Sequence, residues 1–518
     1  PTLKEAEDYY HELLFFAGNH GAARPDDEEQ HSICIYPPDE EFPFAHAARH
    51  SDLTSRKLAV LHHLCLSEQP RIVIAPVPSL LRKSIPRSVL QRYSMNLRVG
   101  EEIDREVLSS KLVQCGYLKV GIVEDRGDYS IRGGIVDVYP PGYSTPVRIE
   151  LFGDVIESIR HFDPVSQKSC GERNDLWIVP VTEAIFEEDN LSQISERIRL
   201  QGGQGMSSNE PVDDLIRDFS EFHVNAEIER YLPYLYPELE TLFDYLPQGS
   251  LIYLHHSEEV KREREILFEQ AEKRYTTATE LDRLIPDIDQ FYLSTEKMDE
   301  RINTFQTIYA DEVSFALPEE EVVSLTTETN EDIRRELINF TSSQAMLSPL
   351  VERMREWQDE GCTVMMICHS QSEVHKLIEL LEEYGVPAQL STGEQVTREL
   401  LTSPATPVRI QIAGFTQGFR FPLMGLVVIT EEELFGEKKR RLTPPRVKRG
   451  YFVSDFSELK SGDVMVHIDH GLGIYRGLKR LEIGGESSDY LLLEYQKGDK
   501  LYLPVDRIKL VQKYLGTD

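Results

Sequence analysis

Several common signatures of chemistry are missing from this chain of 518 residues. Its six cysteines form no CxxC pair and have no histidine partner at the spacing of a zinc site, so we expect reduced thiols and no metal centre. No GxxxxGKS or GxxxxGKT sequence occurs. Without the glycine amides and the lysine that hold nucleotide phosphates, we expect no cofactor, no catalytic residues and no ATP hydrolysis in these residues.

Positive charge and long apolar runs are also scarce. The chain has 56 basic and 89 acidic residues, a net charge of −33. Broad DNA wrapping needs clustered Lys and Arg, so this balance favours docking on other proteins. The one basic cluster, Lys438–Arg449, is interpreted as a solvated tether between domains, with phosphate or acidic-surface contact as the alternative. No apolar run approaches the roughly 20 residues that cross a bilayer, so no membrane partner is expected.

The chain is long enough for roughly three to five domains. The first residues predict an amphipathic helix, roughly 3–16, and not a signal peptide, so we expect a cytoplasmic protein. A second helix is predicted at Asp52–Leu66, followed by a short buried strand at Arg71–Ala75. Helix and strand in alternation favour an α/β layer with a parallel sheet.

The following regions differ in pattern. Residues 181–344 are acidic and predicted to be loop-rich, with a mobile stretch at Gln201–Ser208. Residues 345–435 predict a separate α/β unit, whose expected elements are strands at Thr363–Cys368, Val408–Ile412 and Leu426–Thr430 and a helix through Val374–Leu381 that ends at Gly385. Residues 436–450 predict a basic linker, and 451–518 predict short strands of a small SH3-like barrel.

Two acidic runs and two histidine pairs need separate interpretation. Asp26–Glu29 follows a Pro in a predicted loop, and Glu431–Glu433 follows a predicted strand, where we expect a solvated acidic turn and not a metal site. His62-His63 and the His467/His470 pair lack further ligands at suitable spacing, so we expect packing and turn roles.

Asp128–Cys170 is the most informative segment. Apolar, β-branched runs at Ile135–Tyr139 and Val147–Phe152 flank a Pro-Pro-Gly turn, which predicts strand, turn and strand. Alternation places Ile149 and Leu151 on one face, and Arg148, Glu150 and Phe152 on the other. An outward Arg and an outward Phe are typical of an interface anchor. The alternative is an amphipathic strand with one stray aromatic residue.

This segment resembles the UvrA-binding domain shared by UvrB and the bacterial transcription-repair coupling factors (Mfd). The resemblance rests on Arg132-Gly133-Gly134, the strand Ile135–Tyr139, Arg148, and Ile159–Asp163 with Ser166-Gln167. It implies that Arg132, Arg148 and Phe152 contact UvrA. It also implies a multidomain α/β fold: a degenerate UvrB/RecA-like motor domain in 1–85 and 181–344, an inserted α+β UvrA-binding domain in 86–180, and a degenerate second lobe in 345–435.

The last region resembles the RNA-polymerase-interacting domain shared by the coupling factors and the CarD regulators. The most diagnostic sequence motifs are His467–Gly473 and Lys500–Val505. The resemblance implies that Leu481 meets the polymerase β subunit; the alternative is a core leucine of a small barrel. Steering charges on the rim of that interface are expected at Arg476, Lys479 and Arg480.

Together the two resemblances imply an adaptor for transcription-coupled nucleotide-excision repair, which binds stalled RNA polymerase and recruits UvrA. In this family an ATP-dependent DNA translocase follows the polymerase-binding module. ATP, Mg²⁺ and most DNA contacts are therefore expected of that motor and not of these residues. The alternatives are a CarD-like transcription regulator, which would not bind UvrA, and a UvrB-like helicase, which would need a P-loop.

Overall fold

The computed structural model describes most of the chain in two compact units, Pro1–Gly436 and Glu437–Asp518. The residues described are 2–17, 33–39, 42, 52–66, 71–185, 190–202, 210–220, 228–279, 284–311, 322–339, 347–390, 408–414, 417–435, 464–467, 471–483, 486–494, 500–504 and 511–513. The predicted mobile stretch Gln201–Ser208 lies almost wholly outside these residues, and the linker 436–450 and Asp26–Glu29 lie wholly outside them.

The first unit begins with two helices that match the prediction. Helix α1 (Leu3–Phe16) starts with a capping box, in which the Thr2 hydroxyl accepts from the Glu5 amide and the Glu5 carboxylate accepts from the Thr2 amide at 2.7 Å. Its buried side chains Ala6, Tyr10 and Leu14 pack with the short strand β1 (Ile33–Ile35). Helix α2 (Asp52–Leu66) precedes β2 (Ile72–Ile74), and β2 pairs with β1 in parallel, as alternation of helix and strand predicts.

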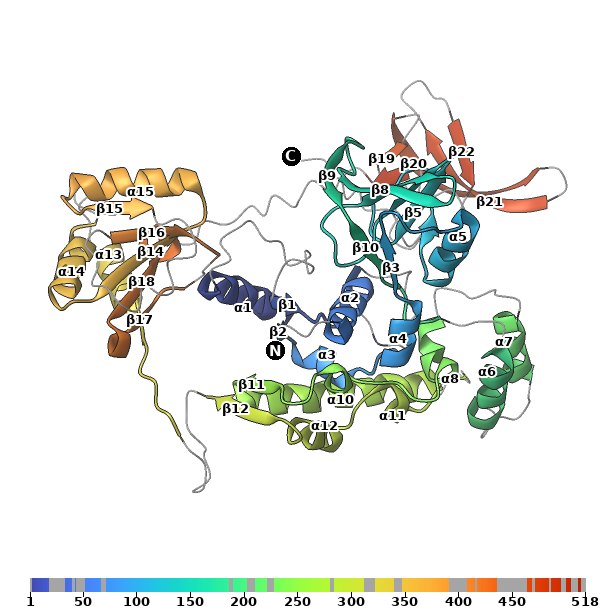
Figure 1. The fold of residues 1–518 in the computed structure, drawn as a ribbon, viewed down its shortest axis with the longest axis horizontal. Helices are drawn as coiled ribbons and strands as arrows, with labels where there is room; N and C mark the ends of the chain where they lie inside the picture. Colours follow the sequence, from blue (N-terminus) through green and yellow to red (C-terminus); the bar gives the residue numbers. More distant parts are fainter. Residues whose placement is uncertain are drawn as a thin grey trace. The chain divides into compact units, whose positions relative to one another are not determined.

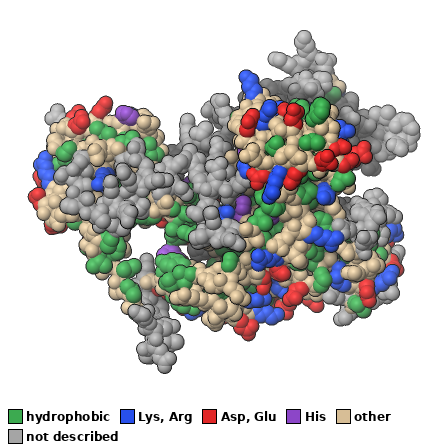
Figure 2. All heavy atoms as spheres, in the orientation of Figure 1, with side chains coloured by type: hydrophobic (Ala, Val, Ile, Leu, Met, Phe, Trp, Pro, Cys, Tyr) green, Lys and Arg blue, Asp and Glu red, His purple; other side chains and the backbone are tan. Residues whose placement is uncertain are grey.

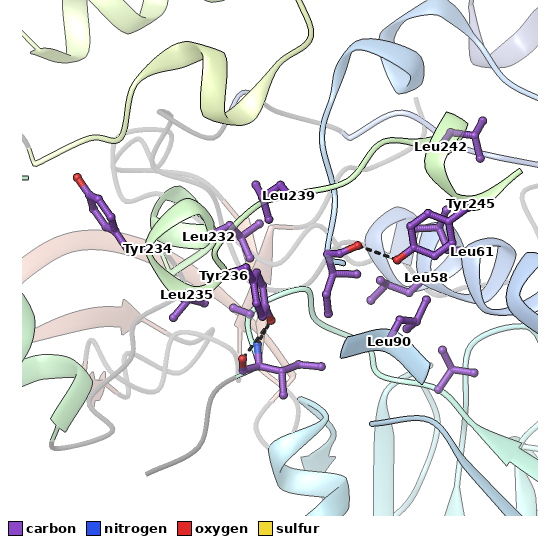
Figure 3. Packing of buried hydrophobic residues seen from close by; sticks show 14 of the residues in the cluster. Leu58, Leu61, Leu90, Leu232, Tyr234, Leu235, Tyr236, Leu239, Leu242 and Tyr245 are labelled. Atoms are coloured by element: carbon purple, nitrogen blue, oxygen red, sulfur yellow. Dashed lines mark hydrogen bonds between the residues drawn. The ribbon is translucent and has the colours of Figure 1, made fainter. Parts of the chain in front are cut away.

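Residues 181–245 are more helical than predicted. They pack with α2 and its neighbours in one hydrophobic cluster, in which tyrosines bring hydroxyls to buried backbone groups (Figure 3). Tyr245 Oη donates to the Ile85 carbonyl at 2.7 Å, and Tyr236 Oη donates to the Glu183 carbonyl at 2.6 Å. The helices of residues 181–245 are α6 (Leu191–Arg197), the π-helix Ile198–Gly202, α7 (Glu210–Ser220), the 3-10 helix Ile228–Tyr231, α8 (Leu232–Leu235) and α9 (Leu242–Tyr245). The helices that follow α2 are α3 (Val77–Leu81) and α4 (Arg87–Tyr93).

A buried ionic network joins the two points where the chain enters and leaves the inserted domain. The Ser84 hydroxyl donates to the Glu183 carboxylate. Lys57 Nζ lies 3.1 Å from Glu183 and 2.7 Å from Asp39. The side chains of Lys57 and Glu183 are buried, and that of Asp39 is largely buried. Although burial opposes ionisation, Lys57 and Arg82 hold the pKa of Asp39 below its usual value. The entry and exit segments therefore lie side by side.

A second parallel pair completes this part of the unit. Strand β11 (Leu251–His255) pairs with β12 (Gln306–Ala310), and the long helix α10 (Ser257–Thr279) connects them with α11 (Ile288–Phe291) and α12 (Thr295–Ile302) (Figure 1). Asp311 follows β12 and caps α10, because its carboxylate accepts from the Ser257 amide at 2.6 Å and from the Ser257 hydroxyl at 2.7 Å.

The inserted domain is built on a six-stranded sheet in the order β4-β5-β6-β7-β8-β9. All neighbours are antiparallel except β4 and β5. Helix α5 (Arg105–Gln114) covers one face with Leu108 and Leu112, and β3 (Met95–Arg98) pairs with β10 (Asp175–Ile178) beside it (Figure 1). The strands are β4 (Leu118–Lys119), β5 (Asp128–Arg132), β6 (Ile135–Val138), β7 (Val147–Phe152), β8 (Val155–Phe162) and β9 (Ser169–Arg173).

Residues 322–435 form an α/β unit with a six-stranded sheet in the order β13-β17-β18-β14-β16-β15. The four strands from β18 to β15 in this order are parallel to one another. Helices α14 and α15 pack in one core cluster with the side chains on one face of this sheet. Helix α15 ends as predicted, because Gly385 adopts a φ of +72°. The elements are β13 (Glu328–Thr329), α13 (Glu331–Asn339), α14 (Ser348–Asp359), β14 (Thr363–Cys368), α15 (Gln371–Glu383), β15 (Ala388–Leu390), β16 (Val408–Ile412), β17 (Phe419–Phe421), a 3-10 turn (Pro422–Met424), β18 (Leu426–Thr430) and α17 (Glu431–Phe435).

The second unit contains an antiparallel sheet in the order β22-β21-β20-β19-β23. Its strands are β19 (Val464–His467), β20 (Gly471–Ile483), β21 (Glu486–Glu494), β22 (Lys500–Pro504) and β23 (Val511–Lys513). Every element that the structure describes in this unit is a strand, in agreement with the predicted short strands. Among the described strands, β22 and β23 form the two ends of this sheet.

Candidate functional site: the arginine face of the inserted domain

The Arg132-Gly133-Gly134 turn has a separate physical reason for each glycine. Gly133 adopts a φ of +61°, a left-handed conformation that costs a side-chain-bearing residue energy. A Cβ on Gly134 would lie 2.7 Å from the Leu151 carbonyl oxygen, so that position needs a close backbone approach to β7. Arg105 on α5 donates to the Gly133 carbonyl at 2.6 Å and ties the turn to the helix.

The strand register brings a row of polar side chains onto one face of the sheet. Asp137 pairs with Arg148, Arg148 with Arg160, and Arg160 with Glu172, one residue from each of four neighbouring strands. The alternate residues Val136, Ile149 and Ile159 pair across the same strands and are buried under α5. We call the surface carrying Arg132, Arg148 and Arg160 the arginine face.

Asp137 organises two of the three arginines. Its side chain is fully buried and receives Arg148 Nε at 2.7 Å and Nη2 at 2.9 Å, a two-point contact. Arg132 Nη2 lies 2.6 Å from the same carboxylate. The hydrogen bond from Arg148 to Asp137 raises the pKa of Arg148. The predicted outward direction of Arg148 is therefore only partly right: its side chain is 17% exposed, whereas that of Arg132 is 50% exposed.

Further contacts hold the Arg148 side chain in place. Its guanidinium lies 4.8 Å from the centroid of the buried Phe162 ring, and Nη1 lies 3.5 Å from the Gln167 carbonyl. Gln167 belongs to a turn in which Asp163 accepts from the Ser166 amide at 2.6 Å. The motif residues Asp163, Ser166 and Gln167 thus form the local support of Arg148.

Phe152 is the most exposed aromatic group of this surface. It ends β7 opposite Val155 in the tight β7–β8 hairpin, where Gly153 adopts a φ of +63°. A bulge between Glu150 and Leu151 interrupts the register of β7. Leu151 still packs against the core, as predicted, while Phe152 is 78% exposed. An aromatic ring this exposed is poorly explained by packing within the domain.

Two residues of this surface were not singled out from the sequence. Asp137 is the one acid within the apolar strand Ile135–Val138, and an ionisable residue in a buried run is a signal for a paired charge. Arg160 lies opposite Arg148 and near the carboxylates of Glu150 and Glu172, at 3.6 and 3.7 Å. Its place in the row depends on strand register, which the sequence alone leaves open.

The predicted polymerase-contacting residues lie on one long strand, β20. Arg476 is exposed and forms a 2.6 Å ion pair with Glu494 of β21, and Lys479 is exposed opposite Tyr490. Gly477 has a φ of +108° within the register shift between Tyr475 and Leu478. Arg480 and Leu481 pair through their backbones with Asp489 and Ser488; the side chains of Arg480 and Leu481 lie outside the described part of the structure.

The expectation of a solvated acidic turn at Glu431–Glu433 is wrong. Glu431 is only 7% exposed, and Glu433 accepts the backbone N–H groups of Gly418 and Thr430, each at 2.9 Å. The Asn330 amide also donates to Glu433 at 3.1 Å. Glu433 therefore satisfies buried donors where β17 and β18 meet, which is a structural task for a carboxylate.

Other candidate chemistry is limited in the described residues. Within them, no three His, Cys, Asp or Glu side chains come together in a way that could hold a metal ion. None of the helices that the structure describes is long and apolar enough to cross a membrane. On the face drawn in Figure 2, Lys and Arg side chains are interspersed with Asp and Glu over the described surface.

Two regions of the chain, one in the inserted domain and one in the second unit, match known domain families. Residues 95–183 match the family model of the UvrB interaction domain, and residues 459–515 match that of the CarD-like/TRCF RID domain. The transcription-repair-coupling factor of Myxococcus xanthus is 31% identical over 519 residues, which cover 98% of this chain and 42% of the relative. That of Bacillus subtilis is 30% identical over 506 residues, covering 95% and 41%. The chain thus spans about two fifths of the length of these curated relatives. The chain belongs to the transcription-repair-coupling factor family, and it carries a UvrB interaction domain and a CarD-like/TRCF RID domain.

Proposed function

We propose that this chain is the adaptor part of a transcription-repair-coupling factor, with two protein-binding surfaces. The inserted domain recruits UvrA through the arginine face and Phe152, and the second unit binds the RNA polymerase β subunit through β20. The observation that carries the UvrA half is the 78% exposure of Phe152 in a domain whose other large aromatic side chains are mostly buried.

The arginine face has the physical properties of a protein-binding surface. Arg148 and Arg132 are held by the buried Asp137, so little side-chain entropy remains to be lost when a partner binds. Exposed aromatic and Arg side chains are the residue types most enriched at binding hot spots. An acidic or carbonyl-rich surface of UvrA would complement Arg132 and Arg160, the more exposed of the three arginines.

The polymerase half rests on different observations. In β20 the exposed Lys479 and Arg476 lie on the strand that also carries Leu481, in the region matched by the CarD-like/TRCF RID model. Basic groups around an apolar contact would steer association and fix its orientation. Catalysis, ATP, Mg²⁺ and sustained DNA contacts belong, in this proposal, to a motor outside these residues, and the site of action is the cytoplasm.

The decisive experiment is a bridging assay. Purified chain is mixed with RNA polymerase and UvrA, singly and together, and complexes are separated by size-exclusion chromatography. We expect the chain to form a binary complex with each partner. We also expect UvrA to co-elute with RNA polymerase only when the chain is present. Binding to polymerase without UvrA would favour a CarD-like regulator, and ATP turnover by the chain alone would favour a UvrB-like helicase.

A further inference from the structure

A cavity of about 520 Å³ opens between α2 and the inserted domain. Helix α2 contributes His62 and His63, and the inserted domain contributes Tyr143, Arg173 and Trp177. Arg71, just before β2, lies at the same cavity. Its volume is within the range of sites that bind small molecules. Arg132, Arg148 and Phe152 are not among its described lining residues, so it is separate from the arginine face.

One wall of the cavity is aromatic and held in place. The Trp177 ring meets the His62 ring edge to face, with centroids 4.9 Å apart. The Trp177 backbone N–H donates to Tyr143 Oη at 3.0 Å. The Arg173 guanidinium lies 5.0 Å from the centroid of the Tyr143 ring. These contacts hold the rings in position before any ligand enters, which lowers the entropic cost of stacking a planar group.

The charges lining the cavity favour an anion. Arg71 and Arg173 contribute two positive charges, and Asp175 contributes one negative charge. Arg173 Nε donates to the Asp175 carbonyl at 3.1 Å, so the guanidinium is held beside the start of β10. Burial lowers the pKa of His62 to about 3 and that of His63 to about 4, so both rings are neutral at pH 7 and remain able to donate or accept a hydrogen bond.

A second observation points independently to a ligand. His62 is 1% exposed, and its Nε2 atom has no hydrogen-bond partner in the described structure. A buried polar atom without a partner costs about 1–3 kcal/mol, so such atoms are uncommon unless something else satisfies them. His62 lines the cavity, so this unpartnered atom belongs to a side chain of the cavity wall, where a small rotation of the ring would let a ligand accept or donate the missing hydrogen bond.

We propose that this cavity binds a planar organic anion. Its ring packs against Trp177, its anionic group is held by Arg71 and Arg173, and a polar atom forms a hydrogen bond with His62. Phosphate and carboxylate groups share the required chemistry. The site lies where the inserted domain meets α2, so its ligand would contact both parts of the first unit. This inference does not depend on binding of UvrA or polymerase.

The chain offers a direct optical test, because it contains two tryptophans and the second, Trp357, is buried in a different core cluster. Trp357→Phe leaves Trp177 as the only tryptophan. We expect phenyl phosphate or benzoate to change its fluorescence in a saturable way, and the stronger of the two identifies the anionic group. Phenol and inorganic phosphate, which each lack one half of the ligand, should bind at least about tenfold more weakly, a difference of about 1.4 kcal/mol.

Variants of Arg71 then locate the anionic group. In the Trp357→Phe background, Arg71→Gln should weaken binding at least about tenfold, whereas Arg71→Lys, which keeps the charge, should lose less. Arg92→Gln is the matched control, because Arg92 is exposed on α4 and does not line the cavity. Thermal unfolding checks that each variant is folded.

Three results would overturn the proposal. One is the absence of any saturable change with phenyl phosphate or benzoate up to about 10 mM, which corresponds to binding weaker than about 3 kcal/mol. Another is binding of phenol as strong as that of the stronger of the two anionic probes. The third is equal binding by folded Arg71→Gln and Arg92→Gln variants. The probe titrations decide the matter even if Arg71→Gln does not fold.

Discussion

Phe152→Ala separates an interface role from a packing role by magnitude. Full burial of a Phe side chain contributes about 1.5–3 kcal/mol to folding, but Phe152 is 78% exposed, so its truncation should change the free energy of unfolding by only about 0.3–0.7 kcal/mol. If Phe152 anchors UvrA, the same change should weaken binding by at least about 2 kcal/mol, roughly 30-fold in Kd.

The assay measures the Kd for UvrA by biolayer interferometry and the unfolding free energy by urea denaturation. Val113→Ala is the matched control, because Val113 is 59% exposed in the same domain and lies on α5, which covers the other face of the sheet. We expect Val113→Ala to leave UvrA binding unchanged. A Phe152→Ala protein of normal stability that binds UvrA within threefold of the unaltered chain would refute the reasoning.

Three further predictions use other parts of the molecule. Leu481→Arg should weaken RNA polymerase binding at least about 30-fold without changing UvrA binding, measured by the same method; equal loss of both would indicate misfolding. Burial, followed by neighbouring carboxylates, raises the pKa of Glu229 to about 7 from 4.5. The folded protein therefore keeps a proton that the unfolded chain loses, and this contribution to stability is lost as pH rises through that interval. In urea denaturation, Glu229→Gln should therefore reduce the decrease in unfolding free energy between about pH 4.5 and pH 7. An unchanged pH dependence would contradict the raised pKa of Glu229. Glu433→Ala leaves the amides of Gly418 and Thr430 without their acceptor, so it should cost about 2–4 kcal/mol in urea denaturation; a variant of unchanged stability would show that these donors find other acceptors.

Local patterns predicted individual elements well. Helix α2 has the bounds Asp52–Leu66 that its apolar spacing indicated, and β14 has the bounds Thr363–Cys368 of its continuous apolar run. Strand β14 also shows why such a run is apolar throughout. Val364 and Met366 belong to the cluster with α14 and α15, while Met365 and Ile367 face the cluster that includes Phe15.

Features that depend on distant pairing were not predictable in the same way. The position of Arg148 follows from the register of β6 and β7, which brings Asp137 opposite it. The burial of Glu433 could not be predicted from the acidic run alone, because its hydrogen-bond partners Gly418 and Asn330 come from elsewhere in the chain. The cavity beside α2 combines residues more than a hundred positions apart, from His62 to Trp177. Sequence spacing carries no information about such contacts.

The adjacency of Ser84 and Glu183 has a consequence for how this family can be rebuilt. Ser84 precedes the inserted domain and Glu183 follows it, and the two side chains are hydrogen-bonded to each other. The inserted domain therefore begins and ends at the same place on the rest of the first unit. Replacing it with a short loop would leave the host's remaining connections unstretched. Conversely, the excised domain could be grafted into a surface turn of an unrelated protein, where the proposed binding of UvrA would be tested apart from the rest of the chain.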